Sequence, residues 1–342
     1  MSDGSQKPIS QNPLSQKPKS EELMSEELMN GEMMSGEPIA ALVAGLAPGR
    51  THLLWDNGNG TAAVWRMEPT GEVRRHQFGP FAGWAARALA VGPDGRVCLL
   101  WTRRDGGASL WSVDMEDGGR RHWEFSQCAG WAVRALAVGP DDVVRVLWTG
   151  PGGRVALWSL REGESPESLD CGPFAGWAAV SLSVGPDNRA QVLWTRGDGA
   201  ASLWLVGADG RAEQAKYGPF AGWRAVAAAS AGRGGAGRLL WQGARGLASL
   251  WDMPGGQRPG EDKPSGRESL PPDWQPQAVH GPFEGWTPAA VALGADEAAH
   301  VLWRFDGGGL ASVWRMMGSE EATHAEYGPY GGWVPVALAL GP

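Results

Sequence analysis

Residues 79–111 read GPFAGWAARALAVGPDGRVCLLWTRRDGGASLW, and close variants of this stretch recur along the chain. The stretch carries three tryptophans, in Gly83-Trp84, in Leu99-Leu100-Trp101 and in Ser109-Leu110-Trp111. Gly-Pro-Asp-Gly and Asp-Gly-Gly lie between the apolar runs, and such sequences are typical of tight turns. The stretch therefore predicts short strands joined by turns.

Three series of tryptophans define the repeat. Steps within each series are 46 or 47 residues, apart from one step of 62 or 63, and 18 of the 20 tryptophans lie on this lattice. A period near 46 residues that is held six times indicates a repeat architecture. The Gly-Trp series is Trp84, Trp131, Trp177, Trp223, Trp286 and Trp333. The other two series are Trp55, Trp101, Trp148, Trp194, Trp241 and Trp303, and Trp65, Trp111, Trp158, Trp204, Trp251 and Trp314.

Each repeat is predicted to form one antiparallel sheet of four strands. In the unit quoted above the first three strands fall at 83–91, 97–101 and 108–113, and a weaker fourth strand leads into the next Gly-Pro-Phe. Helical repeats of similar period do not fit, because glycine and proline interrupt the pattern about every ten residues. β-Solenoids use a shorter period. The prediction is an all-β, six-bladed β-propeller of four-stranded repeats of about 46 residues.

The two ends of the repeat region predict how the ring closes. Residues 333–341 resemble a first strand and are expected to complete the blade begun by residues 51–80. Residues 39–47 are a second candidate for the same place, and only one of the two segments fits in the ring. Pairing of the first and last repeats removes the open sheet edges.

Two segments depart from the lattice. Residues 1–37 are rich in Ser, Glu and Met and contain no tryptophan, which predicts a disordered acidic tail. Residues 254–276 form a Pro- and Gly-rich insertion that is expected to be a surface loop. The expected domains are therefore the tail at 1–37 and the propeller at 38–342.

The repeated motifs resemble those of a known class of proteins. Gly-Pro-Phe-Ala-Gly-Trp, Leu-Ala-Val-Gly-Pro-Asp-Gly, Leu-Leu-Trp and Ala-Ser-Leu-Trp resemble the signature of bacterial tryptophan-rich repeat propellers over residues 39–342. Their rhythm also loosely resembles the sugar-binding propeller of the tachylectin-2 type, although that family has Phe-rich second strands. The resemblance implies several equivalent binding sites between neighbouring blades.

The Gly-Trp series supplies the first candidate site residues: Trp84, Trp131, Trp177, Trp223, Trp286 and Trp333. A flat indole in a loop between blades can stack on the apolar side of a sugar ring and donate its N–H to a hydroxyl. Filling the gap between blades explains the same recurrence, because large aromatic residues are usually buried. The other two series are expected to lie in the core.

The turns after Leu-Leu-Trp supply the second set. Asparagine or aspartate precedes glycine there in four repeats, whereas the third and fifth repeats have Gly152-Gly153 and Arg245-Gly246 instead. These side chains are candidates to bind ligand hydroxyls together with nearby arginines, although Asx-Gly is also a common hairpin turn. The candidates are Asn59, Asp105, Asp198 and Asp306, with Arg103, Arg196 and Arg304 beside them.

Composition excludes several function classes. The formal net charge of the 342-residue chain is -8 and no block of lysine and arginine occurs, so no nucleic-acid partner is expected. No secretory or membrane-spanning pattern is visible, which leaves the cytoplasm as the default location and export by another route open. Three cysteines without a C-x-x-C pair argue against disulfides and thiolate metal sites.

No catalytic residues, cofactor or metal site are predicted. The six histidines form no metal-ligand pair, and neither a G-x-S-x-G elbow nor a Walker A loop is present. Residues 56–60 contain acidic and amide side chains but lack the final bidentate acid of a calcium loop.

The sequence thus favours a non-catalytic, multivalent, lectin-like carbohydrate-binding protein, expected to be a monomer. The alternative is a protein-interaction scaffold that uses the propeller surface, the tail or the insertion loop. The ligand is accordingly a carbohydrate or a protein.

Overall fold

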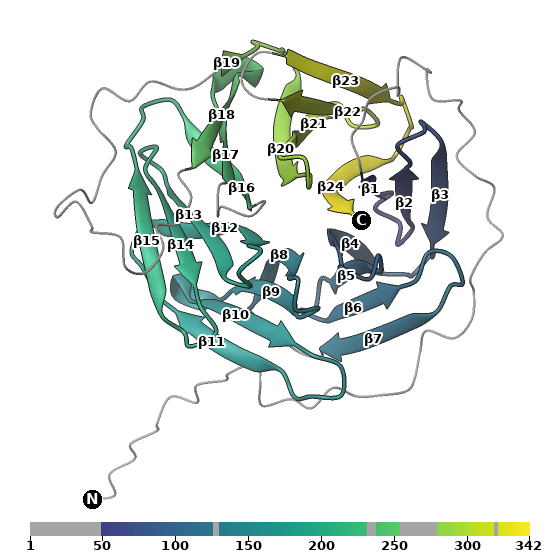
Figure 1. Ribbon diagram of the computed structural model, residues 1–342, viewed down its shortest axis with the longest axis horizontal. Coiled ribbons are helices and arrows are strands. Elements are labelled where there is room, and N and C mark those ends of the chain that lie inside the picture. The colour runs from purple at the N-terminus through teal and green to yellow at the C-terminus, as the bar shows by residue number, and fades with distance from the viewer. Residues whose placement is uncertain (1–48, 126–129, 231–236, 254–278, 318–320) are drawn as a thin grey trace, which may run out of the picture.

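Six sheets surround one axis, as the ribbon in Figure 1 shows. The computed structural model describes residues 49–125, 130–230, 237–253, 279–317 and 321–342. Within them, each sheet has four antiparallel strands, and the strand nearest the axis contacts the inner strands of both neighbouring sheets. The predicted six-bladed β-propeller is confirmed.

Blades 1 to 3 are numbered in chain order, and the strands of each blade are given from the inner strand outward. In blade 1 the inner strand comes from the C-terminal end of the chain, whereas in the other blades it is the first strand in sequence. The strands of blade 1 are β24 (Val334–Gly341), β1 (Arg50–Asp56), β2 (Ala62–Met67) and β3 (Val73–Phe78). Those of blade 2 are β4 (Trp84–Val91), β5 (Val97–Arg103), β6 (Ala108–Val113) and β7 (Arg120–Phe125). Those of blade 3 are β8 (Ala132–Val138), β9 (Val144–Thr149), β10 (Val155–Leu160) and β11 (Glu167–Cys171).

Blades 4 to 6 follow the same plan, and short 3-10 turns join the second and third strands of blades 3 and 5. These turns are η2 (Pro151–Gly153) and η3 (Ala244–Gly246). The strands of blade 4 are β12 (Trp177–Val184), β13 (Ala190–Arg196), β14 (Ala201–Val206) and β15 (Ala212–Tyr217). Those of blade 5 are β16 (Arg224–Ser230), β17 (Gly237–Gln242), β18 (Ala248–Met253) and β19 (Val279–His280). Those of blade 6 are β20 (Trp286–Leu293), β21 (Ala299–Phe305), β22 (Ala311–Met317) and β23 (Glu321–Tyr327).

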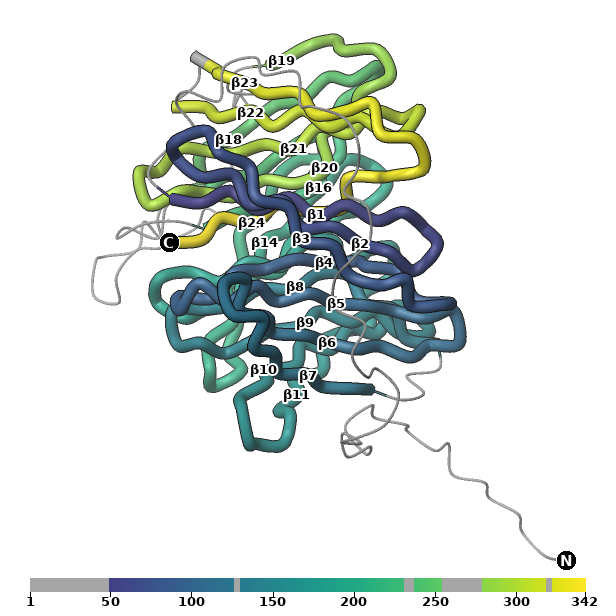
Figure 2. Tube along the Cα trace, turned by 90° about the vertical axis from the view of Figure 1, so that its right-hand side faces the viewer, coloured from purple at the N-terminus to yellow at the C-terminus, as the bar shows by residue number. Residues whose placement is uncertain are grey.

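The ring closes where the C-terminal strand β24 pairs with β1. The register runs from Arg50 opposite Gly341 to Asp56 opposite Val334, so the last strand of the chain completes the first blade. Figure 2 shows these two strands side by side. The prediction for residues 333–341 is confirmed, whereas residues 39–47, the tail at 1–37 and the insertion at 254–276 lie outside the described residues.

The second and third strands of each blade are buried on both sides because a neighbouring blade covers each side. In blade 4, Trp194 packs with Leu147 of blade 3, whereas Leu193 packs with Trp241 of blade 5. Tryptophans of the Leu-Trp series on the second strands are at most 2% exposed: Trp55, Trp101, Trp148, Trp194, Trp241 and Trp303. The tryptophans of the third strands form the other strand series, and they are also buried, except that Trp204 and Trp314 are partly exposed.

The connectors between blades bind to one blade and pack on the next. Phe81 donates its backbone N–H to the carbonyl oxygen of Gly60 in blade 1, at 2.9 Å, while its ring lies against Trp101 in blade 2, with centroids 5.3 Å apart. Gly60 has a φ of +92°, and a Cβ there would overlap the carbonyl oxygen of Phe81. The same backbone bond joins Phe220 to Gly199, Phe283 to Gly246 and Tyr330 to Gly309.

Every inner strand contains a β-bulge. In blade 2, Ala86 and Ala88 pair with consecutive residues of β5, so Arg87 is the extra residue. The extra residues of all six blades line the central channel, a cavity of about 290 Å³. A bulge bends its strand and increases the local twist, which suits a strand that lines a narrow axis.

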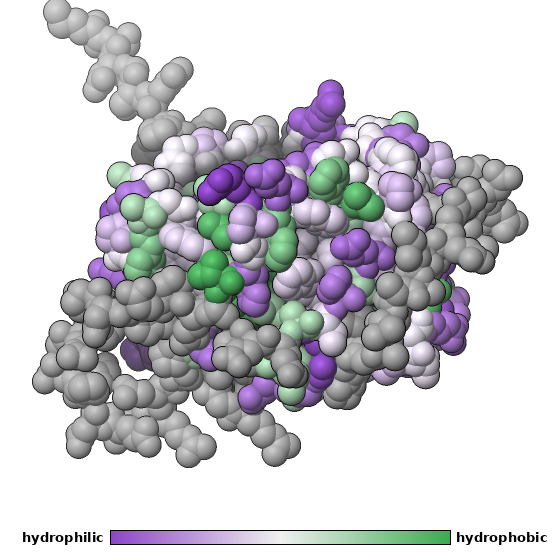
Figure 3. Space-filling model, turned by 90° about the horizontal axis from the view of Figure 1, so that it is seen from above, coloured by the Kyte–Doolittle hydropathy of each residue, from purple (hydrophilic) through white to green (hydrophobic). Residues whose placement is uncertain are grey.

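The outer surface is mixed in character. On the side drawn in Figure 3, hydrophilic and weakly hydrophobic residues are interspersed, and strongly hydrophobic residues form small separate groups. Single exposed apolar residues of this kind include Val279 and Met317. Such scattered residues are normal for a protein surface.

Substitution of Gly60 tests the connector geometry. Gly60→Ala places a Cβ against the backbone of Phe81, and we expect it to lower the free energy of unfolding by about 3 kcal/mol or more. The matched control is Gly58→Ala in the same turn, where φ is +77° and nothing lies within 4 Å of the Cβ position. The control should lose only about 1 kcal/mol for the left-handed backbone. Equal losses in denaturant unfolding would contradict the close approach.

Two buried histidines lie near the boundary between blade 1 and blade 6. His52 on β1 and His300 on β21 are at most 2% exposed, and Nδ1 of His300 lies 3.5 Å from Oγ1 of Thr51. Burial, assisted by Arg66 for His52 and by Arg315 for His300, lowers the pKa of each imidazole to about 4. Glu68 near His52 and Asp296 near His300 oppose this shift. Both side chains are therefore neutral in the folded protein near neutral pH.

The lowered pKa values predict acid destabilisation. An unfolded histidine has a pKa near 6.5, so between pH 6.5 and 4 the unfolded chain binds protons that the folded protein does not. The free energy of unfolding should fall in this window by about 3 kcal/mol for each histidine. Denaturation midpoints measured from pH 7 to 4 on the native chain and on a His52→Gln/His300→Gln variant isolate the contribution of the two histidines. If stability falls with pH equally in both proteins, the histidines do not contribute.

Candidate functional site

A cluster of three aromatic rings recurs at the boundary between blades. It consists of the tryptophans of the second and third strands and a ring from the connector that precedes the blade; we call it the aromatic triad. In blade 2 the centroids of Trp101 and Trp111 are 5.7 Å apart, and Phe81 lies 5.3 and 5.2 Å from them. In blade 3, Phe125 from the end of the outer strand of blade 2 lies 6.2 and 5.2 Å from Trp148 and Trp158. The connector residue Cys128 lies outside the described residues.

The serine of the Ser-Leu-Trp motif binds the indole of the same motif. Trp111 donates its Nε1–H to Oγ of Ser109 at 2.9 Å, and the same bond forms in blades 4, 5 and 6. Blades 1 and 3 have Ala63 and Ala156 at this position. Within the described part of the chain, the indole nitrogens of Trp65 and Trp158 have no hydrogen-bond partner. The recurring serine thus satisfies a buried donor.

The Gly-Trp indoles lie at the start of the inner strands or one residue before it, and arginines lie over three of them. Trp84, Trp131 and Trp333 are 9% exposed, while Trp177, Trp223 and Trp286 are partly exposed. The guanidinium carbons of Arg103, Arg154 and Arg196 lie 5.0, 5.4 and 5.1 Å from the rings of Trp84, Trp131 and Trp177. This geometry is typical of cation–π contacts. The role of this series in ligand binding stays a prediction.

Three of the four predicted turn residues hold their own turns. Oδ1 of Asp198 accepts the backbone N–H of Ala200 at 3.0 Å, and the carboxylate contacts Arg196 at 2.6 Å. Asp105 binds Gly107 and Arg103 in the same way, and Oδ1 of Asn59 accepts the N–H of Thr61. The arginine bond, followed by the backbone N–H bond, lowers the pKa of Asp105 and of Asp198. Each carboxylate therefore positions the arginine that covers the neighbouring indole.

Asp306 lies one position earlier than the equivalence with Asp105 and Asp198 requires. Phe305 pairs with Trp286 as Arg103 pairs with Trp84, so Gly307 is the counterpart of Asp105. The turn in blade 6 is one residue longer, with Phe305 bonded to Leu310. Oδ1 of Asp306 accepts the hydroxyl of Thr287 at 2.8 Å instead. Arg304 is likewise displaced from the position of Arg103 and Arg196.

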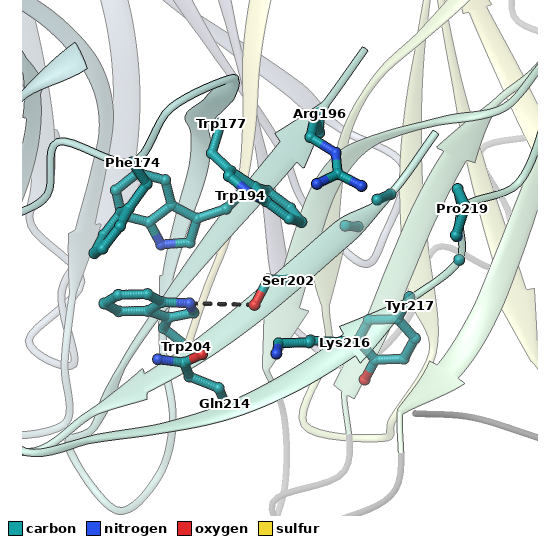
Figure 4. Close-up of a pocket in the computed structure, with 13 residues that line it drawn as sticks. Phe174, Trp177, Trp194, Arg196, Ser202, Trp204, Gln214, Lys216, Tyr217 and Pro219 are labelled. Atoms are coloured by element: carbon teal, nitrogen blue, oxygen red, sulfur yellow. Dashed lines mark hydrogen bonds between the residues drawn. The ribbon is translucent and has the colours of Figure 1, made fainter. Parts of the chain in front are cut away.

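Blade 4 carries an open cavity of about 420 Å³ on the side that faces blade 3. In Figure 4, Phe174, Trp194 and Trp204 lie on one side and Arg196 and Lys216 on the other. Trp177, Ser202, Gln214 and Tyr217 also line the cavity, with Gly218, Pro219 and the alanines at 200 and 201. Of the predicted site residues, the structure brings Trp177 to this cavity directly and Asp198 through its bond to Arg196.

A small residue accounts for the opening. The last residue of each outer strand occupies one equivalent position, opposite the first residue of the third strand. In four blades a ring there contacts a tryptophan of the following blade, as Phe78 contacts Trp111 at 6.2 Å. Blade 3 has Cys171 in this place. Trp204 of blade 4 is accordingly partly exposed, and Phe174 is 37% exposed.

Sequence reasoning missed Lys216, Gln214 and Phe174 as site residues. Cys171 stands where the equivalent repeats have Phe78, Phe125 and Tyr217, and this departure from the repeat was the available signal. Cys171 and Cys98 are inert in character, since burial raises the pKa of both thiols, to about 12 for Cys98.

No group of three or more His, Cys, Asp or Glu side chains among the described residues is placed to bind a metal ion. No helix among them is both long enough and apolar enough to cross a membrane.

Comparison with solved structures supports the fold. A protein of unknown function from Bacteroides caccae aligns at a TM-score of 0.55 and 10% identity, covering 86% of this chain and 99% of that chain. A PQQ-bound aldose sugar dehydrogenase from Streptomyces coelicolor aligns at 0.45 and 16% identity, covering 70% and 80%. The fucose-recognising, six-bladed lectin of Aleuria aurantia aligns at 0.46 and 15% identity, covering 80% and 93%.

The likeness to the Bacteroides caccae protein extends to the fold and not to an activity, since propellers host unrelated functions. No protein-family model matches the chain, and no curated protein matches it. The resemblance to bacterial repeat propellers and to tachylectin-2 stays a prediction.

A pair of serine substitutions tests whether water reaches the blade 4 triad. Ser109→Ala leaves the indole N–H of the buried Trp111 without a partner, and we expect a loss of about 1–2 kcal/mol in the free energy of unfolding. Ser202→Ala removes the same bond from the partly exposed Trp204, where water can replace it, so the loss should be smaller. Chemical denaturation of both variants measures the difference. A larger loss for Ser202→Ala would mean that Trp204 is closed to solvent.

Proposed function

We propose that this protein is a non-catalytic, multivalent, lectin-like carbohydrate-binding protein whose sites lie between blades. The observation that carries the proposal is the blade 4 cavity, in which an accessible aromatic triad faces hydrogen-bonding side chains. The volume of about 420 Å³ falls within the range of small-molecule sites.

The two sides of the cavity match the two sides of a sugar. A pyranose ring presents C–H groups that pack on aromatic rings, and its hydroxyls need donors and acceptors around the edge. Phe174 and Trp204, with centroids 5.0 Å apart, offer exposed aromatic surface. Gln214 and Lys216 are exposed on the outer strand of the same blade and supply polar groups.

Multivalency is part of the proposal because the triad recurs around the ring. Blade 6 has the other partly exposed third-strand tryptophan, Trp314, beside Phe283 at 5.3 Å and His324 at 5.6 Å. Several weak sites on one rigid ring bind a clustered or polymeric glycan more tightly than one site does. The sites differ in their polar residues, so their affinities should differ as well.

A glycan array with the full chain, followed by calorimetry on each hit, tests the proposal. We expect binding that Phe174→Ala weakens about tenfold or more, because this exposed ring forms one wall of the cavity. The control is Met317→Ala, which removes a more exposed apolar side chain, at 52% against 37% for Phe174, from blade 6 outside the cavity and should leave affinity unchanged. No glycan bound by folded protein would overturn the proposal.

A further inference from the structure

The six blades differ at one position that faces the aromatic triad. This position is on the outer strand, directly opposite the serine or alanine two residues before the third-strand tryptophan. Its occupants in blades 1 to 6 are Gln77, Glu124, Asp170, Lys216, Val279 and Glu326. Lys216 is the one cation in this set, and it lies in the blade that carries the open cavity.

The cationic charge of the cavity is not cancelled by its lining. Arg196 and Lys216 both line it, and the lining residues include no aspartate or glutamate. Arg196 is paired with Asp198 outside the lining. No carboxylate of the described residues lies within 4.0 Å of the Lys216 ammonium. The Lys216 ammonium is therefore available to an anionic group of a ligand.

The aromatic side of the cavity restricts which anion fits. Trp194, Trp204 and Phe174 lie within 5.0–5.3 Å of one another and form a continuous apolar wall. Figure 4 shows Arg196 and Lys216 across the cavity from this wall. A bare inorganic anion would leave the wall unused, whereas a neutral sugar would leave the ammonium unpaired. A ring with an apolar side and a carboxylate at its edge uses both.

Building on the proposed function, we propose that the blade 4 cavity selects acidic saccharides, with the carboxylate of a uronic acid residue bound by Lys216 and its ring packed on Phe174 and Trp204. Ser202 lies directly opposite Lys216 and already accepts the Trp204 N–H at 3.2 Å. Arg196 is paired with Asp198, which leaves Lys216 as the charged donor of the lining for this carboxylate. A charge-assisted bond of this kind discriminates strongly between a carboxylate and a hydroxymethyl group.

Matched sugar pairs test the selectivity on the full chain. Calorimetry at low salt compares methyl glucuronide with methyl glucoside, and tri-galacturonate with galactotriose, since each pair differs in its carboxylates. We expect the acidic member to bind about tenfold more tightly, with the preference reduced at high salt. Equal affinities would overturn the selectivity while leaving the lectin proposal intact. Failure of both members, and of every array glycan, would instead overturn the lectin proposal.

Two variants assign the preference to the cavity. Lys216→Glu installs the residue that blades 2 and 6 carry at this position, and it should abolish the acidic preference. The control Arg211→Glu makes the same charge change at a 91% exposed side chain just before the same strand, outside the cavity, and should keep the preference. An equal loss in both variants would attribute the effect to overall charge and overturn the proposal.

A third variant tests the aromatic wall by a different route. Cys171→Phe introduces the aromatic residue that blades 1 and 2 carry at this position, and it should cover Trp204 and weaken uronate binding about tenfold.

Competition by inorganic sulfate distinguishes a uronate site from a site for any small anion. Sulfate that displaces the uronate at equal concentration would show a bare anion site and overturn the proposal, whereas displacement only at large excess supports it.

Discussion

Packing of connector aromatics on the tryptophans of the next blade is the interaction on which the rest of this structure depends. A single four-stranded sheet that is hydrophobic on both sides is not stable in water, so each blade needs a neighbour on either side. The backbone bond from Phe81 to Gly60 fixes the connector on one blade, and its ring contacts with Trp101 and Trp111 fix the next blade. The pairing of β24 with β1 supplies the last neighbour and closes the ring.

The need for each blade to pack against its neighbours also explains how the aromatic triad of blade 4 becomes a candidate site. Phe78 ends the outer strand of blade 1 and covers the third-strand tryptophan of blade 2, Trp111. At Cys171 the side chain is too short to reach, and the packing surface of Trp204 and Phe174 opens to solvent. Because the sheet is held by the other contacts of the ring, one blade can carry this exposed aromatic surface. The polar residues around it then differ freely from blade to blade.

Several features followed directly from the order of residues. The tryptophan lattice predicted the number of blades and the four strands of each repeat, because both depend on periodicity and on the turn residues between strands. It gave residues 333–341 as one of two candidates for the closing strand, and the structure has them there. It also predicted that the tryptophans of the second and third strands lie in the core. The structure confirms this except for Trp204 and Trp314, which are partly exposed. The equivalence of Asp306 with Asp105 failed because an extra turn residue shifts the pairing, which a motif alone does not reveal.

The sequence by itself determined the architecture, since six repeats whose central strands are apolar on both sides each need a neighbouring sheet on either side. Only the tertiary structure decided where a ligand can reach. Register placed Lys216 opposite Ser202, and blade packing placed Cys171 of one repeat beside Trp204 of the next. The physical reason is that the accessibility of a side chain depends on contacts between residues of different repeats across a blade boundary. The repeat period describes each repeat separately and does not show at which boundary the contacting side chains are small enough to leave a cavity.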